Sequence, residues 1–131
     1  MGYREFVEGL LALEYAGVKT TLAEPPWSLK RAQLPALFPL LPTGEQAPLE
    51  MGGNVALATA RATLMVAMEP LGQGWRPTNY AGALDMMDSV RETLSQAKVG
   101  RGKLSWEIRM EGIEVAGTMF WGIVIDVEGR V

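Results

Sequence analysis

The sequence predicts an α+β domain in which two helices pack against a single, antiparallel-leaning sheet. Two stretches repeat their apolar residues at spacings of three and four, which is typical of helices that bury one side. Three other stretches alternate apolar residues with other types, which predicts strands. The chain has 131 residues, of which 48% are hydrophobic. We therefore expect residues 1–131 to form one domain around one core.

The first helix is predicted over residues 3–16. Phe6, Leu10 and Leu13 recur at spacings of four and three and would form its buried stripe. Gly17 follows, in the position where a glycine commonly ends a helix.

The next region is rich in proline and glycine. Residues 18–24 are expected to hold a short extended piece, which Pro25-Pro26 ends. Residues 34–41 are apolar but contain two prolines, so we predict an edge strand or an irregular extended segment. Residues 42–53 contain three glycines and two prolines and are predicted to form a long loop.

The clearest strand signal lies in residues 54–68. Every second residue from Ala56 to Met68 is apolar, which predicts one buried face. The alanine-rich first half of this stretch could instead be helical, because alanine is a poor strand former.

A second helix is predicted over residues 80–97, after a loop at residues 69–78. Thr78 or Asn79 would cap its first turn. Its apolar stripe is expected to comprise Tyr80, Ala83, Leu84, Met87, Val90, Leu94 and Ala97. Asp85, Asp88, Arg91 and Glu92 would face solvent.

Two strands are predicted after this helix, at residues 104–110 and 115–127. A turn near Glu111-Gly112 would join them as an antiparallel hairpin. The second strand carries apolar residues on both faces, so we expect it to be partly covered on both sides.

The residue types that are missing narrow the chemistry. The chain contains no histidine and no cysteine, so it lacks the commonest general base, thiolate nucleophiles and zinc–thiolate ligands. Its net charge of −3 gives no electrostatic reason for tight binding to nucleic acid. No apolar run approaches the roughly 20 residues that a membrane span needs. We expect a soluble, cytosolically made protein that is not an enzyme and has no cofactor or metal.

Paired carboxylates are the strongest remaining candidates for catalysis. Asp85 and Asp88 share one side of the predicted helix, but such a pair is more often an exposed helix surface. Glu107, Glu111 and Glu114 near the hairpin turn are interpreted as solvation of a sheet edge.

Two further patterns have a functional and a structural interpretation. Gly72-Gln73-Gly74 precedes a helix but fits neither the dinucleotide nor the P-loop spacing, so a turn is favoured. Lys98, Arg101 and Lys103 could contact nucleic acid or an acidic partner. We favour the structural interpretation, in which these cations lie near a helix C-terminus and are stabilised by its dipole.

The four tryptophans fall into two groups. Trp106 and Trp121 lie on apolar strand faces and are predicted to be core residues. Trp27 and Trp75 lie in loops beside proline and glycine, and are candidate interface anchors, although they could equally cap the ends of the core.

The order of elements resembles that of the tail terminator family of long-tailed bacteriophages. The resemblance is carried by Leu34-Pro35-Ala36-Leu37-Phe38-Pro39 before a long loop, by residues 62–68 followed by the helix at 80–97, and by a closing strand. That closing strand reads Gly117-Thr118-Met119-Phe120-Trp121-Gly122-Ile123-Val124-Ile125. The resemblance covers nearly the whole chain as a pattern of elements, without a diagnostic motif.

The resemblance implies a structural virion protein in the tail or neck of a phage, assembled in the host cytoplasm. Its copies would form a ring, commonly a hexamer, that caps the tail tube, ends tube polymerisation and joins the head–tail connector protein. DNA would pass through the centre without being read. Glu45, Gln46 and Glu50 of the predicted loop are candidates to line this lumen, where the carboxylates would repel phosphates.

Three alternatives remain open at this stage. The chain could be a neck or head-completion protein, since related folds occur there. It could be a small-ligand-binding α+β domain with a pocket between sheet and helix. It could also be an enzyme that uses Asp85 and Asp88.

Overall fold

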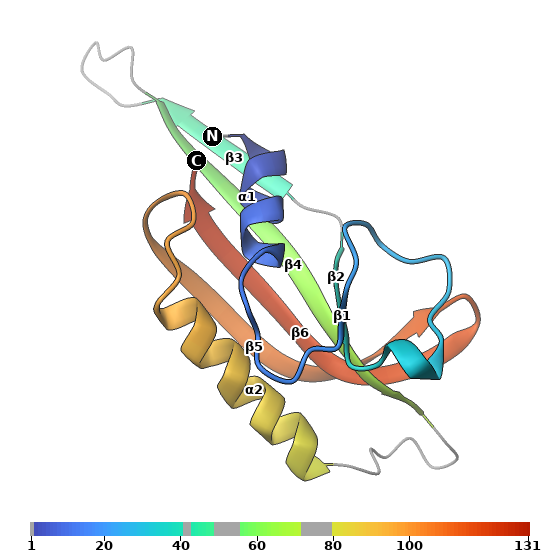
Figure 1. The fold of residues 1–131 in the computed structure, drawn as a ribbon. Helices are drawn as coiled ribbons and strands as arrows, with labels where there is room; N and C mark the ends of the chain where they lie inside the picture. The colour runs from blue at the N-terminus through green and yellow to red at the C-terminus, as the bar shows by residue number, and fades with distance from the viewer. Residues whose placement is uncertain (1, 41–42, 49–55, 72–79) are drawn as a thin grey trace.

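The fold is a curved sheet with two helices laid across it (Figure 1). The structure is a computed structural model that describes residues 2–40, 43–48, 56–71 and 80–131. Its helices are α1 (Tyr3–Leu11) and α2 (Tyr80–Ser95), with a short 3-10 helix at Arg31–Gln33. Its strands are β1 (Thr20–Thr21), β2 (Ala36–Pro39), β3 (Thr43–Pro48), β4 (Ala56–Pro70), β5 (Arg101–Val115) and β6 (Thr118–Arg130).

The sheet has six strands in the order β1-β2-β4-β6-β5, with β3 also paired to β4. Strands β2 and β3 share one side of β4: β2 pairs with Leu64–Ala67 and β3 with Ala56–Arg61. All of these pairings are antiparallel except the one between β1 and β2. The predicted fold class, an α+β domain with one mainly antiparallel sheet and two helices, is confirmed.

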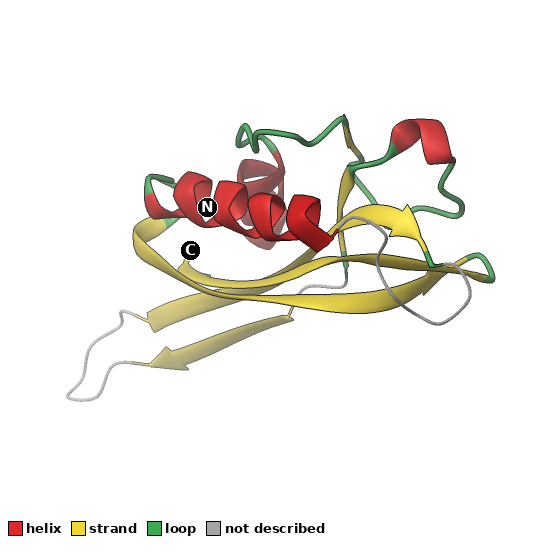
Figure 2. Cartoon of the chain, turned by 90° about the horizontal axis from the view of Figure 1, so that it is seen from below, coloured by secondary structure: helices red, strands yellow, loops and turns green. Residues whose placement is uncertain are grey.

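Both helices lie on the same face of the sheet (Figure 2). Their apolar residues pack against alternate residues of the long strands and form the main core, so this face of the sheet is covered. The buried members of this core include Phe6, Leu10, Leu37, Ala60, Ala62, Leu64, Val66, Ala83, Met86, Val90, Leu94, Ile123, Ile125 and Val127. We call this the helix-covered face.

A smaller core lies on the opposite side of the same strands. Phe38, Met65 and Val124 alternate with members of the main core and are buried. Leu22, Leu29 and Leu34 pack against them, so the segment that follows β1 covers this end of the second face. The predicted strand at residues 54–68 is therefore confirmed from Ala56 onward, with residues 54–55 outside the described residues, and it is buried on two faces over its second half.

Helix α1 ends five residues before the predicted boundary at residue 16. The hydroxyl of the buried Tyr15 donates to the Leu10 carbonyl oxygen at 2.9 Å, and in a longer helix that oxygen would accept the Glu14 N–H. The chain folds back at this point to bring β1 beside β2. Gly17 adopts the expected positive φ (93°), but it does so in this turn and not as a helix cap.

The prediction of an edge strand at residues 34–41 is wrong, because β2 lies between β1 and β4. Proline has no N–H to donate, and here the residues that flank β1 supply donors to this segment. The N–H groups of Lys19 and Leu22 donate to the carbonyl oxygens of Pro35 and Leu37, each at 2.8 Å.

The prediction of a loop throughout residues 42–53 is wrong for Thr43–Pro48, which form β3. Strand β4 is 15 residues long, and the four-residue β2 covers only part of its edge. The backbone groups of Ala56–Arg61 therefore need another partner, which β3 supplies. The remainder of the predicted loop lies outside the described residues.

The predicted hairpin is present, but the turn is not at Glu111-Gly112. It lies at Ala116 and Gly117, whose φ values of 49° and 82° suit a two-residue hairpin turn. Gly112 instead lies within β5 opposite Trp121. Alanine followed by glycine is a weaker turn signal than asparagine followed by glycine, so the sequence did not reveal it.

Helix α2 lies where it was predicted, but only part of its predicted apolar stripe is buried. Ala83, Val90 and Leu94 are buried, whereas Tyr80 is 58% and Leu84 42% exposed. Met86 is buried in their place, so the helix is rotated relative to the predicted stripe. No helix among the described residues is long and apolar enough to cross a membrane.

Candidate functional site

The face of β4, β6 and β5 that points away from the helices carries a connected set of charged and polar side chains. We call it the open face and define it by Arg61, Thr63, Arg109, Asp126 and Glu128. Strand alternation explains its composition, since each of these residues neighbours a core residue in sequence. The register brings the strands together: Thr63 is opposite Asp126 and Arg61 is opposite Glu128.

Asp126 is the centre of this set. Thr63 Oγ1 donates to its Oδ1 at 2.8 Å, and Arg109 Nη1 donates to its Oδ2. Arg109 Nε also donates to Glu111 Oε2 at 3.0 Å, and Arg61 Nε to Glu128 Oε2 at 3.2 Å. The open face thus links three strands through paired charges.

These partners shift the acid–base behaviour of the pair. Partial burial by itself would raise the pKa of Asp126, but the hydrogen bonds from Arg109 and Thr63 and the charge of Arg109 outweigh it and lower the pKa. The hydrogen bonds from Arg109 to Asp126 and Glu111 raise the pKa of the guanidinium. Asp126 is therefore an ionised, hydrogen-bonded carboxylate at neutral pH.

A shallow depression of about 490 Å³ lies on this face. Its lining includes three carboxylates, Glu107, Asp126 and Glu128, against one guanidinium, Arg61. Such a surface favours a basic group and disfavours phosphate.

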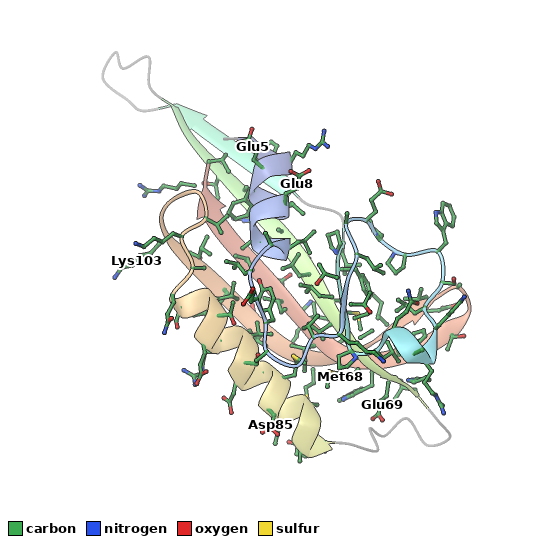
Figure 3. The ribbon with its side chains drawn as sticks, in the orientation of Figure 1. Glu5, Glu8, Met68, Glu69, Asp85 and Lys103 are labelled. Carbon is green, nitrogen blue, oxygen red and sulfur yellow. The ribbon has the colours of Figure 1, made fainter. Side chains whose placement is uncertain are left out.

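The catalytic candidates of the sequence, Asp85 and Asp88, lie on the same helix, α2. Asp85 and Asp88 are exposed on α2, and Arg91 Nε lies 3.8 Å from Asp88 Oδ1. Among the described residues, no three acidic side chains gather as a metal site would need. Figure 3 shows Asp85 and Lys103 near opposite ends of α2.

The glycines beside the basic cluster have backbone roles, and only Gly100 lies in a close contact. A Cβ on Gly100 would lie 2.3 Å from the Arg130 carbonyl oxygen, and both Gly100 and Gly102 have positive φ. These glycines start β5, which explains the local pattern without a ligand. The Gly72-Gln73-Gly74 pattern lies outside the described residues.

Of the two candidate interface anchors, Trp27 is described and Trp75 is not. Trp27 is 95% exposed in the segment that follows β1. Trp106 is half-buried against the main core, as predicted. Trp121 was also predicted as a core residue, but it is half-buried and belongs to neither the main nor the smaller core. Its buried Nε1 has no hydrogen-bond partner within the described part of the chain.

The lumen candidates Glu45 and Gln46 lie on the backbone of β3, opposite Thr59 and Ala58 of β4. Glu50 lies outside the described residues. Two of the three are thus on a strand and not in the predicted loop.

A chain from the virion of a native gene transfer agent particle has a similar fold. The TM-score is 0.52 and the sequence identity 17%, and the match covers 95% of this chain and 92% of the virion chain. No protein-family model and no curated protein sequence matches this chain. At this identity, the likeness to the virion chain is a likeness of fold.

The open face as a unit was not predicted from the sequence. Its polar residues were visible as the outward positions of three strands, but their pairing depends on the strand register. The signal that could have found it was the alternation of Ser105, Glu107 and Arg109 with the apolar residues of the same strand.

Proposed function

We propose that this chain is a non-enzymatic structural protein of a virion, and that its copies form a ring on the end of a phage-type tail tube. The observation that carries the proposal is the fold shared with the virion chain over nearly the full length of both chains. The resemblance of the sequence to tail terminators supports the same assignment independently of that comparison.

In this role the ring ends polymerisation of the tube and presents a surface to the head–tail connector. Six copies are expected from the tail terminator resemblance. The tail tube protein and the connector protein are the proposed partners, and the virion tail or neck, assembled in the host cytoplasm, is the proposed location.

DNA is proposed to pass through the ring without being bound. The net charge of −3 supports this, because a net acidic protein has no general attraction for phosphates. Glu45, Gln46 and Glu50 remain the proposed lumen residues.

The test is assembly of tail tubes from the tube protein of the same virus, with and without this chain. Electron microscopy should show tubes of limited length with a ring at one end when the chain is present. Unchanged tube lengths and no ring would contradict the proposal. A ring that binds the connector but not the tube would assign the chain to the neck instead.

A further inference from the structure

The two lateral sides of the sheet differ from each other. On one side β5 is the last strand and pairs only with β6, while α2 contacts β5 and β6 above it. On the other side, β1 and β3 are the outermost of the described strands. We call these the β5 flank and the β1 flank, and we include α2 in the first and the segment 19–31 in the second.

The strand directions of the two flanks are compatible. Strand β5 runs in the same direction as β4, because both are antiparallel to β6. Strands β3 and β2 are antiparallel to β4, and β1 is parallel to β2. A second copy placed beside the first in the same orientation therefore brings an edge that is antiparallel to β5, and the free backbone groups of an edge strand favour such pairing.

Apolar side chains on α2 point toward the β5 flank. The Ser89 hydroxyl donates to the Ala16 carbonyl oxygen at 2.8 Å, and the Thr93 hydroxyl to the Glu14 carbonyl oxygen at 3.2 Å, so that side of α2 faces residues 14–16. At 100° per residue, Tyr80 and Leu84 lie on the opposite side of the helix. Their exposed fractions are 58% and 42%, so these two neighbouring side chains form an exposed apolar pair on the helix.

The β1 flank carries the complementary features. Trp27 is 95% exposed there, and tryptophan is a common anchor of protein interfaces. The exposed charged residues of segment 19–31 are three cations and one anion: Lys19, Lys30, Arg31 and Glu24. Those of α2 are three anions and one cation: Asp85, Asp88, Glu92 and Arg91. Helix α2 and segment 19–31 therefore have opposite net charge, and by the rotation above Asp88 and Arg91 are the charged residues of α2 nearest Tyr80 and Leu84.

We propose that the β5 flank of one copy of this chain binds the β1 flank of the next copy. The contact joins two different surfaces, so it is head-to-tail and closes into a ring when the rotation per copy divides a full turn. Tyr80 and Leu84 on one copy and Trp27 on its neighbour are the apolar anchors. This inference rests on the proposed ring and states which residues build it.

The test uses one charged substitution on each flank, Leu84→Asp and Trp27→Asp, with the mass of the full chain measured by analytical ultracentrifugation. Each variant alone is expected to sediment as a single copy, because each lacks one half of every contact. An equimolar mixture is expected to form a dimer and nothing larger, because only the intact β1 flank of Leu84→Asp can meet the intact β5 flank of Trp27→Asp.

Gln96→Asp is the matched control. Gln96 is exposed just beyond α2, beside Leu13 and Glu14 on the side away from the β5 flank, and its variant should keep the ring. Melting temperatures within a few degrees of the parent chain should show that all three variants are folded. The milder Leu84→Ala and Trp27→Ala should still weaken assembly at least tenfold, so a folding defect in the aspartate variants does not decide the result.

The outcomes separate the two proposals. A parent ring that persists in both aspartate variants overturns the flank contact but leaves the ring on the tube intact. Dimers of Leu84→Asp alone also overturn it, because they require like flanks to pair. A parent chain that remains a single copy at every concentration and on tail tubes overturns the ring and the flank contact together.

Discussion

The two faces of the central strands differ in how they are held together. On the helix-covered face, Leu64 is completely buried by elements that are distant in sequence. On the open face, its neighbour Thr63 contributes one hydrogen bond to a partly exposed carboxylate, and the surrounding ion pairs are at least two-fifths exposed. Because exposed ion pairs contribute little to stability, we conclude that the helix-covered face stabilises the fold and the open face is available for interactions.

The largest difference is expected between two adjacent residues of β4. Leu64→Ala should lower the free energy of unfolding by about 3 kcal/mol, because it removes buried methyl groups and leaves a cavity. Thr63→Ala should lower it by about 1 kcal/mol or less. Urea denaturation at neutral pH measures both values. Equal losses for the two variants would contradict the comparison.

A close approach between strands should produce the next largest effect. A Cβ on Gly122 would lie 2.2 Å from the Val66 carbonyl oxygen and 3.1 Å from the Ala67 Cα. Since backbone atoms cannot move aside easily, Gly122→Ala should cost about 2 kcal/mol. In β5, a Cβ on Gly112 would meet only side-chain atoms of Leu71 and Met119 as its two nearest neighbours, at 3.3 and 3.5 Å.

Gly112→Ala is the control for this prediction and should change stability by about 0.5 kcal/mol or less. Thermal unfolding of the two alanine variants, side by side, distinguishes a close backbone contact from a general sensitivity of strand glycines. A loss of stability for Gly112→Ala as large as that for Gly122→Ala would show that strand glycines are sensitive in general.

The hydrogen bond that ends α1 should have a smaller effect. Tyr15→Phe removes the buried hydroxyl that donates to the Leu10 carbonyl oxygen, and should cost about 1 kcal/mol. Tyr80→Phe, at an exposed position, should change stability by a few tenths of a kcal/mol. If the two variants are equally stable, this hydrogen bond does not determine where the helix ends.

The smallest effect should be the acid response of the open face. The pKa of Asp126 is lower in the folded chain, so its contribution is present above the unfolded value near 3.8 and is lost as the pH falls through the lower folded value. Asp126→Asn should therefore reduce stability at pH 7 by about 0.5 kcal/mol, since the side chain is partly exposed. The difference from the parent chain should shrink as the pH falls below 4. Denaturation curves at pH 7, 4 and 2.5 measure it, and a difference that is constant with pH would contradict the assignment.

The helices and strands were predictable where one short segment carried the whole signal. The spacing of apolar residues in α2 and the alternation in β4 and β5 arise from the geometry of each element alone. Tyr80 and Leu84 were predicted as core residues because the stripe is visible in sequence, but its exact rotation on the sheet is not. The candidate site was less predictable, because Thr63 and Asp126 are 63 residues apart and meet only through the register of β4 and β6.

The sequence by itself determined the fold class, the order of the main elements and the absence of histidine and cysteine chemistry. Only the tertiary structure decided that Thr43–Pro48 is a strand, that α1 stops at Leu11 and that the hairpin turns at Ala116 and Gly117. Each of these features depends on hydrogen bonds to groups brought close by the fold. Strand β3 pairs with the uncovered edge of β4, and the Tyr15 hydroxyl bonds to the end of α1. The turn position follows from the pairing of β5 with β6 up to Val115 and Thr118. Local propensity could not decide them, because the partner that satisfies each backbone group lies in another part of the chain.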